Sequence, residues 1–278
     1  MSGFQTGFSS QAFQVAAAQG RTALVGYLPV GYPDVPRSLE ALAALCGGPD
    51  DPGVDLVEVG LPYSDPMMDG PVIQAAGTLA LERGVRTKDV FTAVEAVRAA
   101  GKPAVVMTYW NLVDRYGVKA FARDLAAAGG AGLITPDLIP DEAGDWLEAS
   151  DEHGLDRIFL VAPSSSDERI VSTVAACRGW VYATAVMGVT GTRAESAPAA
   201  PALVARIRRL CPNALVGVGL GISNGRQAAE VAAFADAAIV GSAFLKPLLA
   251  VDGGDFARGL ADLAAVRRDL AQGVRTAG

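Results

Sequence analysis

Eight short runs of apolar and β-branched residues alternate with alanine-rich stretches along this chain of 278 residues. Each run has the length of a buried strand, and each intervening stretch has the length and composition of a helix. The expected strands are Leu24–Leu28, Asp55–Gly60, Ala104–Thr108, Gly132–Thr135, Arg157–Ala162, Val181–Thr184, Ala214–Gly219 and Ala237–Gly241. The helices expected after them are Ser38–Cys46, Thr87–Ala99, Val118–Ala128, Asp141–His153, Asp167–Cys177, Ala200–Leu210, Gly225–Phe234 and Asp255–Leu270. This alternation predicts an α/β fold with a parallel sheet, and eight repeats predict a (β/α)8 TIM barrel.

The first residues of the chain add one element to that pattern. Phe4–Gln19 precedes the first strand and is expected to form an additional N-terminal helix. No linker between the repeats is long enough to separate domains, and the length suits one α/β barrel. We therefore expect residues 1–278 to form a single barrel domain.

Charge and cysteine content narrow the possible partners and the compartment. A net charge of −7 argues against binding to nucleic acid or to an anionic membrane surface. An anionic substrate would have to be held locally by backbone amides. The three cysteines lack metal-ligand spacing, which is typical of reduced thiols in the cytoplasm, and no run reaches the ~18 apolar residues of a membrane span. His153 is the only histidine, which argues against a His-ligated metal site or a His-based triad.

Two acidic residues are candidates for acid–base chemistry. Glu58 lies inside an apolar strand, where an ionised carboxylate costs several kcal/mol unless something compensates it, so its pKa should be raised. Asp69 follows in a loop rich in Gly and Pro and should stay ionised. In a barrel of this kind, the carboxyl ends of the strands and the loops after them form the active site. Two alternatives remain open: Glu58 pairs with an arginine, or Asp69 caps a helix that begins near Pro71.

Three glycine-containing segments follow the last three expected strands. They are Gly188–Gly191, Gly219–Ser223 and Gly241–Ser242. Glycines let backbone N–H groups approach phosphate oxygens closely, and a following helix N-terminus adds partial positive charge. Loops after the seventh and eighth strands are a common phosphate site in such barrels. These segments therefore predict a phosphate-binding cradle.

The motifs at these positions resemble those of the tryptophan synthase alpha subunit family. The resemblance rests on the segments EVGLPYSDP (58–66), DGP (69–71), GVTG (188–191), GLGIS (219–223) and VGSA (240–243). It extends from about Phe4 to the last helix. It implies a (β/α)8 lyase that cleaves indole-3-glycerol phosphate by a retro-aldol reaction to indole and glyceraldehyde 3-phosphate.

The resemblance also implies roles for individual residues. Glu58 and Asp69 match the catalytic carboxylates, and Tyr182 matches the supporting active-site tyrosine, although core packing is an alternative for Tyr182. The positions that match phosphate contacts are Gly191, Gly221, Gly241 and Ser242, while Thr190 lies on a mobile loop and Tyr27 and Leu220 line the indole pocket.

Several positions depart from the family pattern, and they affect the pocket and the loop after the sixth strand. Tyr27 stands where a phenylalanine is often found, and Leu220 also replaces a common phenylalanine. Pro29-Val30 replaces a threonine-led pair, and Ala185-Val186 occupies the place of a Ser-Arg pair. The carboxylates and the phosphate cradle are unchanged.

The resemblance further implies a partner. It predicts no cofactor and no metal in this chain, with pyridoxal phosphate carried only by a beta subunit in an alpha2beta2 heterotetramer that receives the indole. Alternatives are a free-standing lyase that releases indole and a non-catalytic activator of the beta subunit. The presence of both Glu58 and Asp69 argues against the non-catalytic activator.

Overall fold

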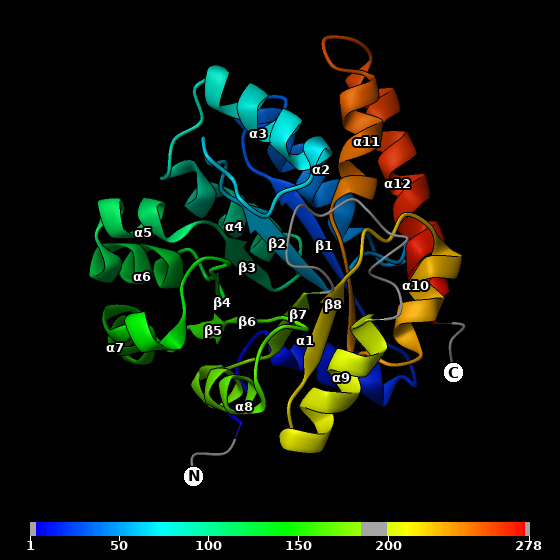
Figure 1. Ribbon diagram of the computed structural model, residues 1–278. Helices are drawn as coiled ribbons and strands as arrows, with labels where there is room; N and C mark the ends of the chain where they lie inside the picture. Colours follow the sequence, from blue (N-terminus) through cyan, green and yellow to red (C-terminus); the bar gives the residue numbers. More distant parts are fainter. Residues whose placement is uncertain (1–3, 185–198, 276–278) are drawn as a thin grey trace.

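The strands of this protein form one parallel sheet that closes on itself. The structure is a computed structural model and describes residues 4–184 and 199–275. Its strands are β1 (Ala23–Pro29), β2 (Leu56–Gly60), β3 (Ala104–Met107), β4 (Gly132–Ile134), β5 (Asp156–Ile158), β6 (Leu160–Val161), β7 (Val181–Thr184), β8 (Val216–Gly219) and β9 (Ala237–Val240). Their order in the sheet is β5-β4-β3-β2-β1-β9-β8-β7-β6. The two outer strands of this order, β5 and β6, are separated in sequence by Phe159 alone, so the sheet is a barrel (Figure 1).

The fifth strand of the barrel is therefore split into two short pieces. Its first piece, β5, pairs with β4, and its second piece, β6, pairs with β7. Arg157 forms an antiparallel bridge with Arg178 instead of joining β7, and only from Phe159 onward does the chain bond to β7, through Tyr182 N–H. The expected single strand Arg157–Ala162 is thus corrected to two pieces that change partners at Phe159, and the (β/α)8 count is retained.

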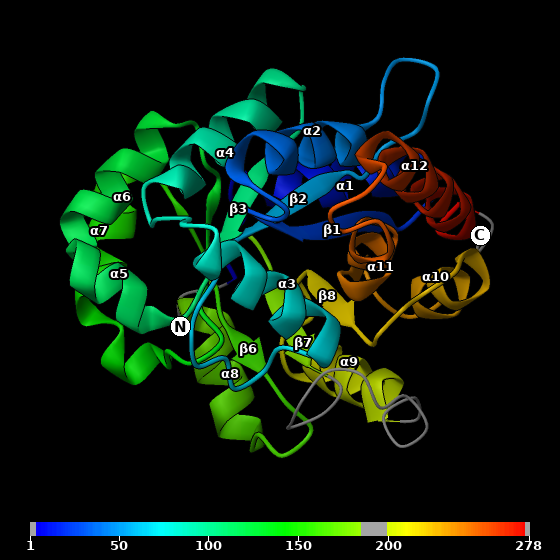
Figure 2. The same cartoon turned by 90° about the horizontal axis from the view of Figure 1, so that it is seen from above.

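Helices surround the barrel, as the view in Figure 2 shows. They are α1 (Ser10–Ala18), α2 (Val35–Cys46), α3 (Pro71–Glu82), α4 (Asp89–Ala99), α5 (Trp110–Tyr116), α6 (Val118–Ala127), the 3-10 helix η1 (Pro140–Glu142), α7 (Gly144–His153), α8 (Asp167–Ala176), α9 (Ala199–Leu210), α10 (Gly225–Ala232), α11 (Ser242–Ala250) and α12 (Phe256–Gly273). The eight helices expected after strands are present. The helices α5 and α11 were not expected, because α5 is only two turns long and α11 contains Pro247, which usually ends a helix. The helix α3 was expected only in the alternative in which Asp69 caps a helix that begins near Pro71.

Two separate hydrophobic clusters hold the barrel together. The larger lies between the outer face of the sheet and the helices. The smaller fills the barrel interior, with Val25, Leu56 and Trp180 among its members. Phe13 and Ala16 of α1 belong to this interior cluster, and the Phe13 and Trp180 ring centroids are 5.4 Å apart. The expected N-terminal helix is therefore present, shorter than Phe4–Gln19, and it closes the end of the barrel at which the strands begin.

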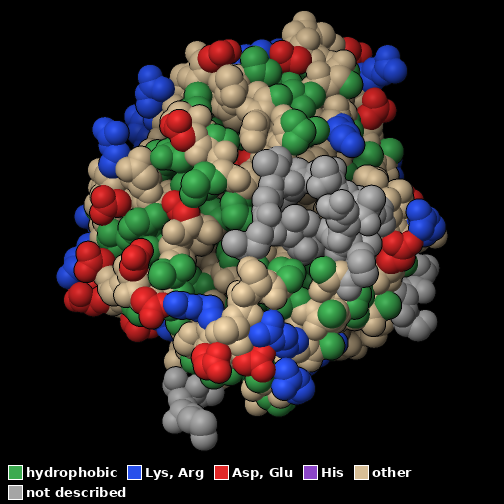
Figure 3. Space-filling model, viewed as in Figure 1, with side chains coloured by type: hydrophobic (Ala, Val, Ile, Leu, Met, Phe, Trp, Pro, Cys, Tyr) green, Lys and Arg blue, Asp and Glu red, His purple; other side chains and the backbone are tan. Residues whose placement is uncertain are grey.

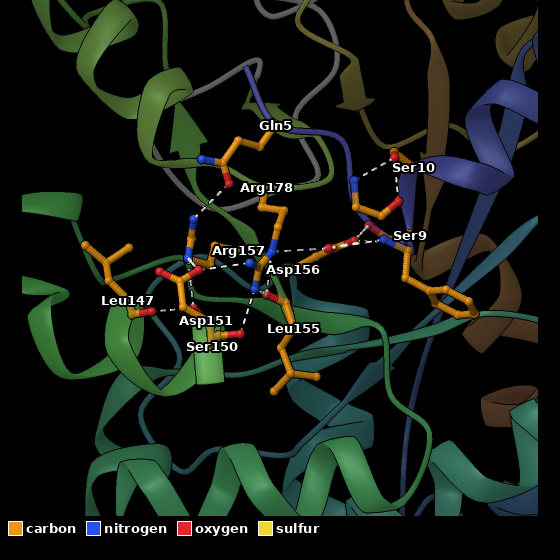
Figure 4. A network of polar contacts seen from close by, with 12 residues as sticks. Gln5, Ser9, Ser10, Leu147, Ser150, Asp151, Leu155, Asp156, Arg157 and Arg178 are labelled. Atoms are coloured by element: carbon orange, nitrogen blue, oxygen red, sulfur yellow. Dashed lines mark hydrogen bonds and ion pairs between the residues drawn. The ribbon is translucent and has the colours of Figure 1, made fainter. Parts of the chain in front are cut away.

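A network of charged and polar groups ties the N-terminal segment to this same end (Figure 4). Asp156, at the start of β5, accepts hydrogen bonds from Ser9 N–H at 2.7 Å and from Ser9 Oγ at 2.5 Å. The Nε of Arg178 lies 3.8 Å from the same carboxylate. Arg157 and Arg178 both reach Asp151, at 2.5 and 2.9 Å. Burial of Asp156 is thus compensated by several donors, which makes this end of the barrel a structural one.

Candidate active site

The interior face of β2 carries a carboxyl group near the end of the strand. Side chains alternate across a strand, and Leu56 belongs to the interior cluster, so Glu58 and Gly60 also face inward. Glu58 is 1% exposed, and its Oε1 has no hydrogen-bond partner among the described residues. Burial raises the pKa of Glu58 to about 8. A group with this pKa can both give and accept a proton near neutral pH.

The alternative in which an arginine neutralises Glu58 finds no support in residues 4–184 and 199–275. Burial is the one cause of its raised pKa there, and no nearby cation lowers it. A fully ionised, unpaired carboxylate at this depth would be strongly disfavoured. The protonated carboxylic acid is therefore the favoured form of Glu58 at pH 7.

The loop between β2 and α3 carries the second carboxyl group. Asp69 is half-buried, and burial raises its pKa to about 6, so it is mostly ionised at pH 7. Gly70 is the N-cap residue of α3, and no side chain among the described residues caps that helix. The alternative in which Asp69 caps the helix is therefore wrong. Gln74 Nε2 donates to the Asp69 carbonyl oxygen at 2.7 Å and holds the end of the loop against α3.

Two tyrosines approach the carboxylates from opposite parts of the sheet. Tyr27 on β1 lies over Gly60, since a Cβ added there would be 2.4 Å from the Tyr27 hydroxyl oxygen. Tyr182 on β7 lies over Gly219 in the same way, at 2.6 Å. Side chains at the two glycine positions would therefore displace the phenol groups.

Electrostatics place these four groups in one site. Burial raises the pKa of Tyr182 well above its ordinary value, and the negative charges of Glu58 and Asp69 raise it further. The pKa of Tyr27 is raised for the same reasons, by burial first and then by Asp69 and Glu58. Both phenols therefore remain protonated hydrogen-bond donors next to the two carboxyl groups. The structure thus brings together Glu58, Asp69, Tyr182 and Tyr27 at the carboxyl end of the barrel.

Glycines after β8 and β9 form the neighbouring part of this end. Gly221 is exposed and has a φ of +63°, in the left-handed region that favours glycine. Gly241 is the N-cap residue of α11, and Ser242 is its first residue; no side chain in the described part of the chain caps this helix. A Cβ added at Gly241 would lie 3.4 Å from the Tyr27 ring, so this helix start borders the carboxylate site. Uncapped helix N-termini favour anions.

The remaining sequence-predicted residues have different outcomes. Leu220 follows β8 and is half-buried, and Pro29 is the last residue of β1. Gly191, Thr190, Ala185 and Val186 lie outside the described residues. His153 ends α7, outside this site. Among the residues that the structure describes, no three His, Cys, Asp or Glu side chains are grouped to hold a metal ion, and no helix is long and apolar enough to cross a membrane.

The surface of the described residues lacks a large basic area on the face shown in Figure 3. Basic and acidic side chains are intermixed around its edge, with hydrophobic side chains between them.

The family model described as tryptophan synthase alpha chain matches residues 13–274. The chain belongs to this family. The tryptophan synthase alpha chain of Mycobacteroides abscessus is 57% identical over 273 residues, which cover 98% of this chain and 99% of that protein. The structure of Mycobacterium tuberculosis tryptophan synthase aligns with a TM-score of 0.88 and 55% identity, covering 98% of this chain and 99% of its counterpart.

A more distant relative extends the comparison to a hyperthermophile. A structure on the mutual activation of the tryptophan synthase α2β2 complex of Pyrococcus furiosus aligns with a TM-score of 0.79 and 29% identity, covering 90% of this chain and 98% of that one. The expected TIM barrel and the expected family are both confirmed. The chain is a lyase that catalyses the alpha reaction of tryptophan synthase, and members of the family pair with a beta subunit.

One residue of this alpha-chain site was missed by the sequence analysis. Tyr109 follows β3, is 4% exposed, and accepts a hydrogen bond from Met68 N–H at 2.9 Å through its hydroxyl oxygen. Its ring stacks on Tyr63, with centroids 5.0 Å apart. The available signal was its position directly after an expected strand, at the carboxyl end, but nothing local indicated that it would reach the loop of Asp69.

Proposed function

We propose that this chain cleaves indole-3-glycerol phosphate with Glu58 as the general acid and base and Asp69 as the charge-stabilising carboxylate. The observation that carries the proposal is the buried Glu58, whose Oε1 has no hydrogen-bond partner among the described residues and whose pKa is about 8. An acid that is protonated at pH 7 but can lose its proton is what a two-step proton transfer requires.

The reaction balances with one carboxyl group acting twice. The Glu58 carboxylic acid protonates indole C3, which turns the ring into an indolenine-like leaving group. The bond between C3 and the glycerol chain then breaks, and its electron pair returns to the ring to give indole. The side-chain hydroxyl gives its proton to the Glu58 carboxylate and becomes the aldehyde of glyceraldehyde 3-phosphate. No electrons are gained or lost overall, and Glu58 ends protonated as it began.

The other groups at this end of the barrel support that chemistry. Asp69, mostly ionised at pH 7, would accept the indole N–H and stabilise the positive charge that develops when C3 is protonated. Tyr182 would orient Glu58 or the substrate through its hydroxyl group, while Tyr27 and Leu220 would line the indole pocket. Backbone amides around Gly221, Gly241 and Ser242 would hold the phosphate, next to the uncapped start of α11. The roles of Gly191 and Thr190 stay predictions from the family.

We infer that the partner is a pyridoxal-phosphate-dependent beta subunit in an α2β2 heterotetramer. The family assignment supports the pairing, and the Pyrococcus furiosus relative is described as a mutually activating α2β2 complex. The loop that carries Asp69 also presents Met67, which is 67% exposed, beside the site. A partner that covers the exposed part of this loop would hold the loop closed over the site. It would thereby raise the fraction of molecules in which Asp69 is placed for catalysis. It would also receive indole without release to solvent.

The test is steady-state indole release by the purified chain, alone and with increasing beta subunit. We expect low activity alone, a saturable increase with partner, and a complex by sedimentation. A flat response with no complex would favour the free-standing lyase. Partner activation without any lyase activity would favour the non-catalytic activator.

Two further expectations belong to this proposal. We infer that the whole chain is one domain, because the described residues share one closed sheet and its surrounding core. A cytoplasmic location stays a prediction, supported by free cysteines at positions 46, 177 and 211.

A further inference from the structure

We propose that Tyr109 is a positioning residue that fixes Asp69 by accepting the backbone N–H of Met68 with its phenol oxygen. The inference rests on the proposed role of Asp69 and adds the group that holds its loop in place. The Tyr109 hydroxyl oxygen lies 2.9 Å from Met68 N, and Met68 is the residue directly before Asp69. A hydrogen bond at that position limits where the Asp69 carboxylate can lie.

Tyr109 is itself held from two sides. Its ring is buried and stacks on Tyr63, with an angle of 28° between the ring planes. It is the N-cap residue of α5, and the next N–H, from Trp110, donates to both oxygens of Asp137 at 2.9 and 3.1 Å. The loop after β4 thus fixes the backbone that carries Tyr109. The phenol oxygen is a fixed point, while the loop that it contacts is exposed.

The loop of Asp69 needs such a fixed point. Its beginning is anchored to β3, because Leu61 N–H donates to the Met107 carbonyl oxygen at 3.0 Å. Its middle is exposed at Ser64, Asp65 and Met67. Exposed loops with few packed side chains open easily. Tyr109 contacts this loop from the neighbouring strand end, just before the residue that has to be placed.

Tyr109 keeps its phenol proton, so its oxygen accepts the Met68 N–H as an uncharged group. Burial and the negative charge of Asp69 raise the pKa of Tyr109 to about 12, against the lowering effect of the loop amides. The phenol therefore stays neutral throughout the working pH range.

Loss of this contact should affect Asp69 in a recognisable way. A loosened loop lets water reach the carboxylate, so the pKa of Asp69 should fall from about 6 toward its ordinary value. The acidic limb of the pH profile would then move to lower pH. Substrate affinity through the phosphate should change little, because the glycines after β8 and β9 are on the other side of the site. A purely structural role for Tyr109 would not move the acidic limb.

The experiment compares Tyr109→Phe with Tyr63→Phe. The first variant removes the phenol oxygen and keeps the stacked ring. The second removes the hydroxyl of the other ring, which among the described residues accepts one long hydrogen bond, from Asn111 Nδ2 at 3.5 Å. We expect Tyr109→Phe to lower kcat roughly 3- to 10-fold with little change in KM. The acidic limb of its pH profile of kcat/KM should move to lower pH. Tyr63→Phe should leave kcat and the position of the acidic limb unchanged. An unchanged kcat and limb in Tyr109→Phe, or equal losses in the two variants, would overturn the proposal.

A second measurement separates this inference from the role of Asp69. Hydrogen exchange of segment 61–70 reports the loop without reference to catalysis, and its protection should fall in Tyr109→Phe only. In an Asp69→Asn background, Tyr109→Phe should cost less than about twofold, because it acts through Asp69. A fully additive loss, or unchanged exchange, would exclude this positioning role of Tyr109. Near-wild-type activity of Asp69→Asn would instead exclude the proposed role of Asp69, whatever the exchange data show.

Discussion

Two carboxyl side chains among the described residues are almost completely buried, and these two side chains lie at opposite ends of the barrel. Asp156, 0% exposed at the end where strands begin, receives hydrogen bonds from Ser9 and lies near Arg178. Glu58, 1% exposed at the end where strands finish, has an oxygen without a partner in the described part of the chain. Burial raises the pKa of both groups, but only at Asp156 do hydrogen bonds from Ser9 and the charge of Arg178 act against that rise.

The difference separates stability from chemistry within one fold. Hydrogen bonds to a buried carboxylate offset part of its desolvation and tie elements together, as Asp156 ties the N-terminal segment to β5. An uncompensated carboxyl group costs stability and gains a pKa near the working pH. Natural proteins keep such groups where a substrate needs them. The predictions below test whether the two ends really divide the work in this way.

The largest effect is expected from Glu58→Gln. The amide has nearly the same shape but cannot transfer a proton, so indole release should fall roughly 10⁴-fold, the upper range for lost acid–base catalysis. Steady-state assays give the rate, and circular dichroism checks the fold. Asp156→Asn is the matched control at the other end. Activity of a folded Glu58→Gln variant within tenfold of wild type would remove Glu58 from the proton transfers.

A smaller loss is expected from Asp69→Asn. The amide keeps a hydrogen-bond acceptor but lacks the charge that stabilises the developing indolenine cation, so kcat should fall about 10²- to 10³-fold. The affinity for glyceraldehyde 3-phosphate, measured by calorimetry, should stay within about twofold. A normal kcat would show that the half-buried loop carboxylate is not needed for the chemistry.

The buried Glu58 should also make the stability of the protein depend on pH. Folding raises the pKa of Glu58 from 4.5 to about 8, so the folded state binds the proton more tightly. The contribution is fully present below pH 4.5 and is lost as pH rises toward 8, with a slope of up to about 1.4 kcal/mol per pH unit. Thermal unfolding of wild type and Glu58→Gln should therefore diverge as pH rises, with the variant becoming relatively more stable. Parallel curves from pH 5 to 8 would mean that Glu58 is compensated after all.

At the other end, Asp156→Asn should reduce stability and spare catalysis. The amide nitrogen would face the donors of Ser9, and Arg178 would lose its buried charge partner, which should cost about 2 kcal/mol of unfolding free energy. Denaturant unfolding measures the loss, and kcat should stay within about twofold. A stable Asp156→Asn variant with low activity would contradict the division between the ends.

The smallest effect is expected from Gly241→Val, which tests the phosphate side of the active end. The added side chain would occupy space beside the start of α11 without meeting atoms closer than 3.4 Å at its Cβ, so folding should survive. Binding of glyceraldehyde 3-phosphate should weaken roughly tenfold, about 1.4 kcal/mol, while indole binding should be unaffected. Gly144→Val, at the first residue of α7 where an added Cβ meets nothing within 4 Å, is the control. Equal titrations for both variants would move the cradle elsewhere.

The sequence by itself determined the repeat and the burial of Glu58 on the second strand. Strand and helix alternation is a local property of neighbouring residues, so the eight repeats and the barrel could be predicted. The apolar neighbours of Glu58 predicted its burial and raised pKa. The phosphate cradle at the glycines after the last strands stays a prediction. The motifs around these residues also predicted the family that the comparison confirmed.

Only the tertiary structure decided which groups meet across the closed sheet. Asp156 is 147 residues from Ser9 in sequence, and Tyr109 is 41 residues from Met68, so no local pattern relates either pair. The split of the fifth strand at Phe159 likewise follows from a change of partner between β4 and β7. Whether Glu58 would find a cation was equally undecided, because that depends on side chains delivered by other strands. Sequence periodicity fixes which face a residue occupies, whereas its partners are set by closure of the barrel, which brings distant strand ends together.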